Sequence, residues 1–158
     1  MATGVITEGA RRASHPGAGA PGRRDRTALA TAIRGLADAP DLAAAADLVG
    51  ECAAWLLRAD RALVVRTEGG DPVVASSRGR GAPPPGQAML ATGTLGAAIS
   101  LAAPQETRRA GIAEVAAPVV LRGGVWGALL VTGPAPGVAP HAAERLAPFA
   151  DLLSLAAA

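Results

Sequence analysis

The segment AAPVVLRGGVWGALLVTGP, residues 116–134, holds two apolar runs on either side of Gly123-Gly124. Apolar runs joined through a glycine pair are typical of a β-hairpin. Both runs are mostly apolar rather than alternating, so we expect a central hairpin with both faces covered. Pro118 lacks an N–H and predicts a β-bulge at residues 117–118. Gly127 lacks a side chain and predicts the close approach of a crossing helix.

Helical periods precede this hairpin. Leu29, Ile33 and Leu36 are spaced as one helical stripe, and Pro40 ends that helix. Asp41 is a good N-cap for a second helix. The apolar stripe of this second helix consists of Leu42, Ala45, Val49, Cys52 and Leu56. The period then shortens, and residues 61–77 predict a strand, a tight turn and a second strand.

The middle of the chain gives shorter signals. Residues 86–92 predict a short helix with Gly93 as its C-terminal cap. Residues 95–103, which read LGAAISLAA, predict a third strand, and residues 104–112 predict a polar connection.

The last segment, residues 141–158, predicts a closing helix with Leu146, Phe149 and Leu153 on one face. Pro148 interrupts it and predicts a kink, or a helix that begins near Pro148. Strands bracketed by helices favour an α+β fold, in which helices flank a central antiparallel sheet of about five strands. We expect one domain over residues 25–158. Residues 1–24 are rich in Gly, Ala, Pro and Arg and predict a disordered tail.

Composition excludes several classes of protein. All 15 Lys and Arg residues are Arg, and the net charge of +2 favours a solvated surface over a nucleic-acid interface. Cys52 is the only cysteine, so neither an intramolecular disulfide nor a multi-cysteine metal site can form. No apolar run reaches membrane-spanning length, and no signal peptide is recognisable. We therefore expect a cytoplasmic protein without a membrane partner.

Four segments in this order resemble GAF domains, which are sensory modules with a PAS-like fold. They are LVGECAAWLLRADRALVVRTEGGDPVVASS (48–77), LATGTLGAAISL (90–101), EVAAPVVLRGGVWGALLVTG (114–133) and HAAERLAPFADLLSLAAA (141–158). The resemblance covers residues 27–158 and implies a sensory or regulatory module of signal transduction. Residues 77–87 are shorter than the lid of many GAF domains, which implies a shallow pocket.

The known ligands and chemistry of GAF domains fit this chain poorly. The cyclic-nucleotide pattern uses Asn, Lys and Phe, but this chain has no Asn or Lys, and its one Phe lies in the closing helix. Cys52 stands in the second helix, away from the bilin-attachment region. His15 stands in the tail and His141 at a helix start, where neither suits a haem ligand. A methionine sulfoxide reductase of this fold needs more than one cysteine. We expect no cofactor and no enzymatic activity.

Two hypotheses remain open. The first is a sensor that holds an unidentified apolar or amphipathic small molecule near Met89, Ser100, Glu114 and Ala116, and acts through a separate signalling partner. The second is a dimerisation or docking module without a ligand, in which the first and last helices pack against a second copy. This second form includes a fragment of a larger signalling protein, such as a histidine kinase or a transcription antiterminator.

Overall fold

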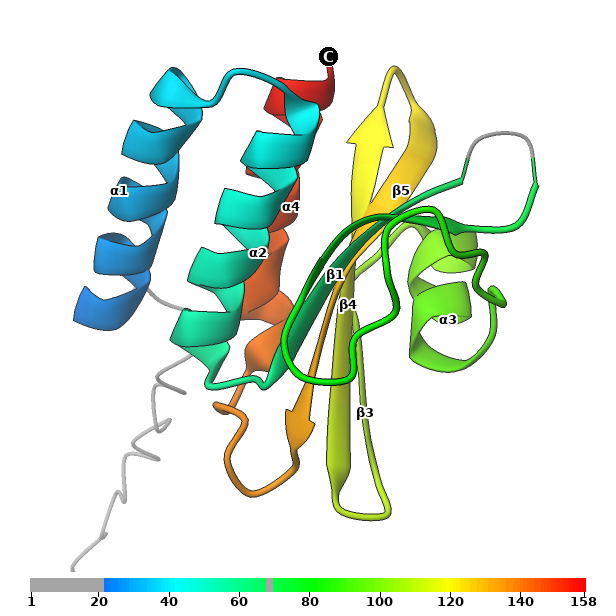
Figure 1. Ribbon diagram of the computed structural model, residues 1–158. Helices are drawn as coiled ribbons and strands as arrows, with labels where there is room; N and C mark the ends of the chain where they lie inside the picture. The colour runs from blue at the N-terminus through cyan, green and yellow to red at the C-terminus, as the bar shows by residue number, and fades with distance from the viewer. Residues whose placement is uncertain (1–21, 68–69) are drawn as a thin grey trace, which may run out of the picture.

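The computed structural model describes residues 22–67 and 70–158 of the chain, and Figure 1 shows its helices and its sheet. The helices are α1 (Arg23–Asp38), α2 (Leu42–Leu57), α3 (Gly93–Leu101) and α4 (Ala142–Ala157). The strands are β1 (Arg61–Arg66), β2 (Val73–Arg78), β3 (Gln105–Arg109), β4 (Ile112–Leu121) and β5 (Gly124–Pro134). All pairs are antiparallel in the order β2-β1-β5-β4-β3, which confirms the predicted α+β class with a five-stranded sheet.

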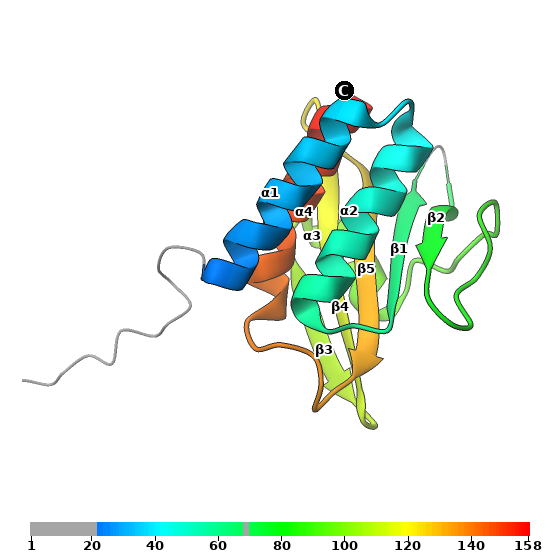
Figure 2. The same ribbon diagram turned by 60° about the vertical axis from the view of Figure 1, so that its left-hand side comes forward.

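The helices divide unequally between the two faces of the sheet. Figures 1 and 2 show α1, α2 and α4 on one face and α3 on the other. Helix α1 is outermost, because it packs on α2 and α4 rather than on a strand. The predicted tail lies outside the described residues except for positions 22–24, of which Arg23 and Arg24 belong to α1. No helix in the described part of the chain is both long and apolar enough to cross a bilayer.

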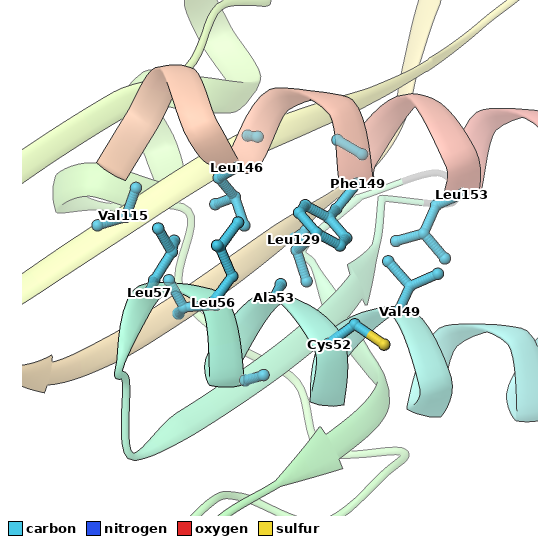
Figure 3. Packing of buried hydrophobic residues seen from close by; sticks show 14 of the residues in the cluster. Val49, Cys52, Ala53, Leu56, Leu57, Val115, Leu129, Leu146, Phe149 and Leu153 are labelled. Atoms are coloured by element: carbon cyan, nitrogen blue, oxygen red, sulfur yellow. The ribbon is translucent and has the colours of Figure 1, made fainter. Parts of the chain in front are cut away.

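The larger part of the core lies between the sheet and helices α2 and α4 (Figure 3). Most of the stripe predicted for α2 is buried there, together with the whole stripe predicted for α4. The stripe residues in this core are Val49, Cys52 and Leu56 from α2, and Leu146, Phe149 and Leu153 from α4. The helical period therefore predicted correctly which faces of α2 and α4 are buried.

The middle of the chain corrects three predictions. Residues 86–92 form no helix, and Gly93 begins α3 instead of ending a helix. Residues 93–101, predicted mainly as strand, form α3 itself, because a short and uniformly apolar run fits a buried helix as well as a buried strand. Residues 105–109, predicted as a polar connection, form the edge strand β3.

The central hairpin is confirmed, but its irregularities differ from the prediction. The register shift between β4 and β5 lies at Val119/Val120, whereas Pro118 pairs regularly with Ala128. Beyond Ala116, β4 has a neighbouring strand on one side only, which is a setting in which strands tolerate proline. The backbone that approaches Gly127 belongs to Val65 of β1, and not to a helix.

The closing helix begins earlier than one prediction allowed. Helix α4 starts at Ala142, directly after His141, and continues through Pro148 to Ala157. The prediction of a start near Pro148 is therefore wrong. Packing against α2 and β4 holds the helix, and the burial of Leu146 before the proline and Phe149 after it outweighs the lost backbone hydrogen bond.

The outer edge of β2 is partly covered by the loop that follows it. The amide of Val74 donates to the carbonyl of Gln87 at 2.9 Å, and the amide of Gly86 donates to the carbonyl of Val74 at 2.8 Å. The amide of Met89 donates to Pro72 at 2.7 Å. This loop therefore runs beside β2 and pairs with it as a short additional strand would.

Helix α1 is held by an ion pair as well as by its small buried face. Only Ala28 and Ala32 of α1 are fully buried. Near its start, the Asp25 carboxylate accepts from Nε of Arg145 on α4 at 2.9 Å and from its Nη2 at 3.2 Å. This two-point geometry, with side chains 14% and 24% exposed, fixes α1 against α4.

We predict that Asp25→Asn lowers the free energy of unfolding by about 1–2 kcal/mol, because the bond it weakens joins charged and mostly buried groups. The matched control is Glu51→Gln, whose partner Arg78 lies 3.4 Å away and whose side chain is 63% exposed. We expect this control to cost about 0.5 kcal/mol or less. Urea unfolding measures the stability of both variants. Equal losses of unfolding free energy would contradict the stabilising role of the Asp25–Arg145 ion pair.

Candidate functional site

The apolar layer between the sheet and α3, where two of the four predicted ligand residues lie, is mostly filled by side chains. Ala116 is completely buried there, in a second cluster with side chains from β1, β2, β5 and α3. Met89 is partly buried and packs against the same cluster. These two predicted site residues therefore lie close to one apolar layer and act there as packing.

The other two predicted residues lie apart. Ser100 is exposed on α3, since the helical period turns its side chain outward. Glu114 is exposed on β4 and lines a surface hollow of about 320 Å³. The remaining residues that line this hollow are Gly93, Thr94, Thr107, Arg109, Ala110 and Ile112. The structure thus brings Glu114 to a hollow that contains none of the other three predicted residues.

The hollow is built where the start of α3 meets strands β3 and β4. Thr94 is 3% exposed, and its hydroxyl donates to Oε2 of Glu114 at 3.1 Å. Thr107 pairs with Glu114 across the two strands, which places it beside the carboxylate. The first turn of α3 also carries backbone N–H groups without helical partners, and Gly93 and Thr94 belong to that turn.

The lining of the hollow combines opposite charges with apolar surface. Glu114 supplies a carboxylate and Arg109 a guanidinium, whereas Ala110 and Ile112 supply apolar area. Such a surface can bind a small amphipathic molecule that carries charged groups of its own. The sequence pattern did not point to Thr94, Thr107 or Arg109, because it predicted Gly93 as a helix cap, residues 95–103 as a strand and residues 104–112 as a polar connection.

Cys52 and His141 lie where the sequence places them. Cys52 is buried on the helical side of the sheet, across the sheet from the hollow. Burial, with a smaller contribution from Glu51, raises the pKa of the Cys52 thiol, so the thiol stays neutral near pH 7. His141 is exposed at the start of α4. Within residues 22–67 and 70–158, no group of three or more His, Cys, Asp or Glu side chains is placed to hold a metal ion.

The helical stripes proposed for dimerisation are largely used inside the chain. Leu146, Phe149 and Leu153 are fully buried against α2 and the sheet, and Leu29 and Leu36 pack against the same core. The exposed large apolar residues of these two helices are Ile33, which belongs to the stripe predicted for α1, and Leu155 on α4. A homodimer through the first and last helices therefore cannot use the buried stripe of α4.

Comparison with known proteins identifies the fold. No protein-family model and no curated protein matches the sequence. Among solved structures, the chain is similar to the GAF domain of a phosphoenolpyruvate-protein phosphotransferase from Acinetobacter, with a TM-score of 0.72, 16% identity, and coverage of 86% of this chain and 93% of that one. A GAF domain from A. aeolicus, described in an inactive state, gives a TM-score of 0.66 and 14% identity, and the match covers 84% of this chain and 94% of that one.

A more distant functional class shares the same fold. The chromophore-binding domain of a bacteriophytochrome from R. palustris gives a TM-score of 0.63 and 14% identity, and the match covers 82% of this chain and 60% of that one. The chain therefore has the GAF fold, as its sequence segments predict.

Proposed function

We propose that this chain is a sensory or regulatory module of signal transduction, with a small amphipathic molecule as its input and contact with another protein as its output. The GAF fold supports a regulatory role, because the neighbours include a domain named for chromophore binding and a GAF domain described in an inactive state. Fold-level likeness supports the class of function, and the site must supply the rest.

The hollow beside Glu114 is the observation that carries the proposed input. Its volume of about 320 Å³ lies at the lower end of the range for small-molecule sites. The buried hydroxyl of Thr94 orients the carboxylate of Glu114, so one charged group is already positioned before a ligand binds. An opposite charge from Arg109 suits a molecule of amino-acid size with an amino group and an acid group. The module itself catalyses no reaction in this proposal.

The first test is native mass spectrometry of the purified protein, followed by titration of the captured molecule or of free amino acids. We expect Glu114→Gln to weaken binding about tenfold or more, because a hydrogen bond to a charged group is lost. Glu144→Gln is the matched control, since Glu144 is exposed on α4, across the sheet from the hollow. Equal binding by both variants would place the ligand elsewhere.

A second candidate is the module without a ligand. The closed packing of the α3 face around Ala116 favours it, because a buried ligand would have to displace side chains that already fill the space. A protein that captures no molecule and binds none of the probes, yet associates with itself or a partner, would have this second function.

A further inference from the structure

The connection from β2 to α3 contains three consecutive prolines, Pro83, Pro84 and Pro85. Proline fixes its own φ at about −65°, and a residue that precedes a proline is restricted to extended conformations. Residues 82–84 each precede a proline, so their backbone is of the polyproline II type. Figure 2 shows the connection in green at the edge of the sheet, beyond β2, with α1 on the opposite side of the molecule.

Two tight turns enclose this stretch. Residues 79–82 form the first turn, which a hydrogen bond of 3.3 Å between its first carbonyl and its last amide closes, with Gly81 at φ 72°. Residues 84–87 form the second turn, closed in the same way at 3.3 Å, with Gly86 at φ 92°. Glycine with a positive φ at the third position is typical of a type II turn. Both ends of the stretch therefore have a defined backbone.

The two turns are attached to the body of the molecule. Gly79 lies against the residue before β1, since an added Cβ atom would overlap the carbonyl oxygen of Asp60. The amide of Gly86 donates to the carbonyl of Val74 in β2 at 2.8 Å. Between these points, Ala82 packs against the cluster between the sheet and α3. The prolines are thus held in place before any partner binds, which lowers the entropic cost of binding.

The prolines face solvent. Pro84 and Pro85 are exposed, and Pro83 is partly buried. Because proline has no backbone N–H, these residues cannot pair as a regular strand with another chain. An exposed polyproline II segment is instead recognised through its side chains, by grooves lined with aromatic residues.

The charge around the prolines is mostly positive. Arg80 is exposed in the first turn, and Arg78 ends β2 with its side chain 50% exposed. Nη1 of Arg61 lies 3.5 Å from a carbonyl oxygen of the same turn. Two exposed carboxylates lie nearby, since Asp60 lies beside this turn and Glu51 pairs with Arg78 at 3.4 Å. The positive groups outnumber them, so an acidic surface on a partner would complement this region.

We propose that residues 80–85, which we call the proline segment, are the docking site for a protein with an aromatic-lined groove and an acidic residue at its rim. Pro84 and Pro85 enter the groove, and Arg80 pairs with the acidic residue. The proposal deepens the proposed function, because it gives the chemical class of the protein contacted, and it rests on that function for its regulatory meaning. It uses no residue of the hollow beside Glu114.

The main test measures binding of the whole chain to three purified probes that contain such grooves: an SH3 domain, a WW domain and an EVH1 domain. Biolayer interferometry gives the dissociation constants. We expect at least one probe to bind. We expect the double variant Pro84→Ala/Pro85→Ala to raise that dissociation constant about tenfold or more, because it removes both groove contacts and the fixed backbone.

Pro136→Ala is the matched control, since Pro136 is exposed in the turn between β5 and α4. We expect it to bind the probe as the wild type does. All the replaced prolines are exposed, so both variants should fold, and circular dichroism checks this. Failure of all three probes to bind, or equal binding by the wild type and the double variant, would overturn the proposal.

Arg80→Glu tests the charge separately. We expect it to raise the dissociation constant about threefold or more, because like charges then face each other. Arg122→Glu, which changes an exposed arginine between β4 and β5, should have no effect. Binding that is indifferent to Arg80→Glu would overturn the acidic rim. Glu114→Gln should bind the probe normally, so failure of the ligand proposal and failure of this one are distinguishable.

Discussion

Replacing Gly127 by alanine is expected to remove about 3 kcal/mol or more of stability, which is a large part of what a domain of this size has. Gly127 stands in the middle of β5, opposite Arg66 of β1. A Cβ atom added to it would overlap the carbonyl oxygen of Val65 and lie 3.1 Å from the carbonyl carbon of that residue. Both atoms belong to the backbone of a central strand, so they cannot move without weakening the β1–β5 pairing.

Gly124→Ala is the matched control for this prediction. Gly124 lies in the same strand, and an added Cβ would meet nothing closer than the carbonyl oxygen of Leu121 at 3.8 Å. We expect this variant to change the free energy of unfolding by about 0.5 kcal/mol or less. Urea unfolding followed by circular dichroism measures both. If Gly127→Ala were as stable as Gly124→Ala, the close contact between Gly127 and the β1 backbone would be contradicted.

Phe149→Ala is expected to lower the free energy of unfolding by about 3–5 kcal/mol, because it empties a large volume in a closed core. Phe149 is the only phenylalanine and is completely buried. Figure 3 shows its ring in the layer that includes Leu129 of β5 and Leu153 of α4. The loss would reach the whole stability of many single domains, so the variant should be unfolded or partly unfolded at room temperature.

Leu101→Ala provides the comparison for Phe149→Ala. Leu101 ends α3 and is 65% exposed, so its replacement by alanine removes apolar volume without opening a cavity in the core. We expect a loss of about 0.5 kcal/mol or less. The two variants are compared by thermal and urea unfolding. A small loss for Phe149→Ala would mean that α4 does not close the helical side of the sheet.

The parts of the fold that the sequence predicts correctly are those with a clear period. Val49 and Leu56 in α2, and Leu146 and Leu153 in α4, repeat with the helical spacing and are buried as predicted. The β4–β5 hairpin carries its own turn signal at Gly123-Gly124. In these segments the local pattern and the tertiary packing agree, so the sequence alone suffices.

The errors lie where local pattern and packing give different answers. The run at residues 93–101 is apolar on nearly every side, so it has no period that separates helix from strand. Strand β3, with the sequence QETRR, has no apolar alternation, because it lies at the edge of the sheet. It forms a strand only through its pairing with β4. Its position is decided by pairing with residues 112–116, and that information is not local.

These errors also limited the prediction of the site. Glu114 and Ala116 lie on one face of β4, since alternate residues of a strand share a face, but only Glu114 lines the hollow. Ser100 lies apart from both, because residues 95–101, predicted as strand, belong to helix α3. Thr107 was missed because its strand was not recognised, although pairing with Glu114 brings it into the hollow. A site composed of residues from two paired strands can be predicted only when both strands have been predicted correctly.

The hydrogen bonds that the loop after β2 makes with Val74 also influence aggregation. An open strand edge is a template to which a strand of another molecule can add, and such addition leads to aggregates. Val74 directs both of its outward backbone groups to Gly86 and Gln87, so this part of β2 offers no free groups to another chain. At the opposite edge, β3 presents Glu106, Arg108 and Arg109, charges that oppose strand addition. Growth of the sheet beyond one molecule is therefore opposed at both edges, so reversible assembly is left to side-chain surfaces.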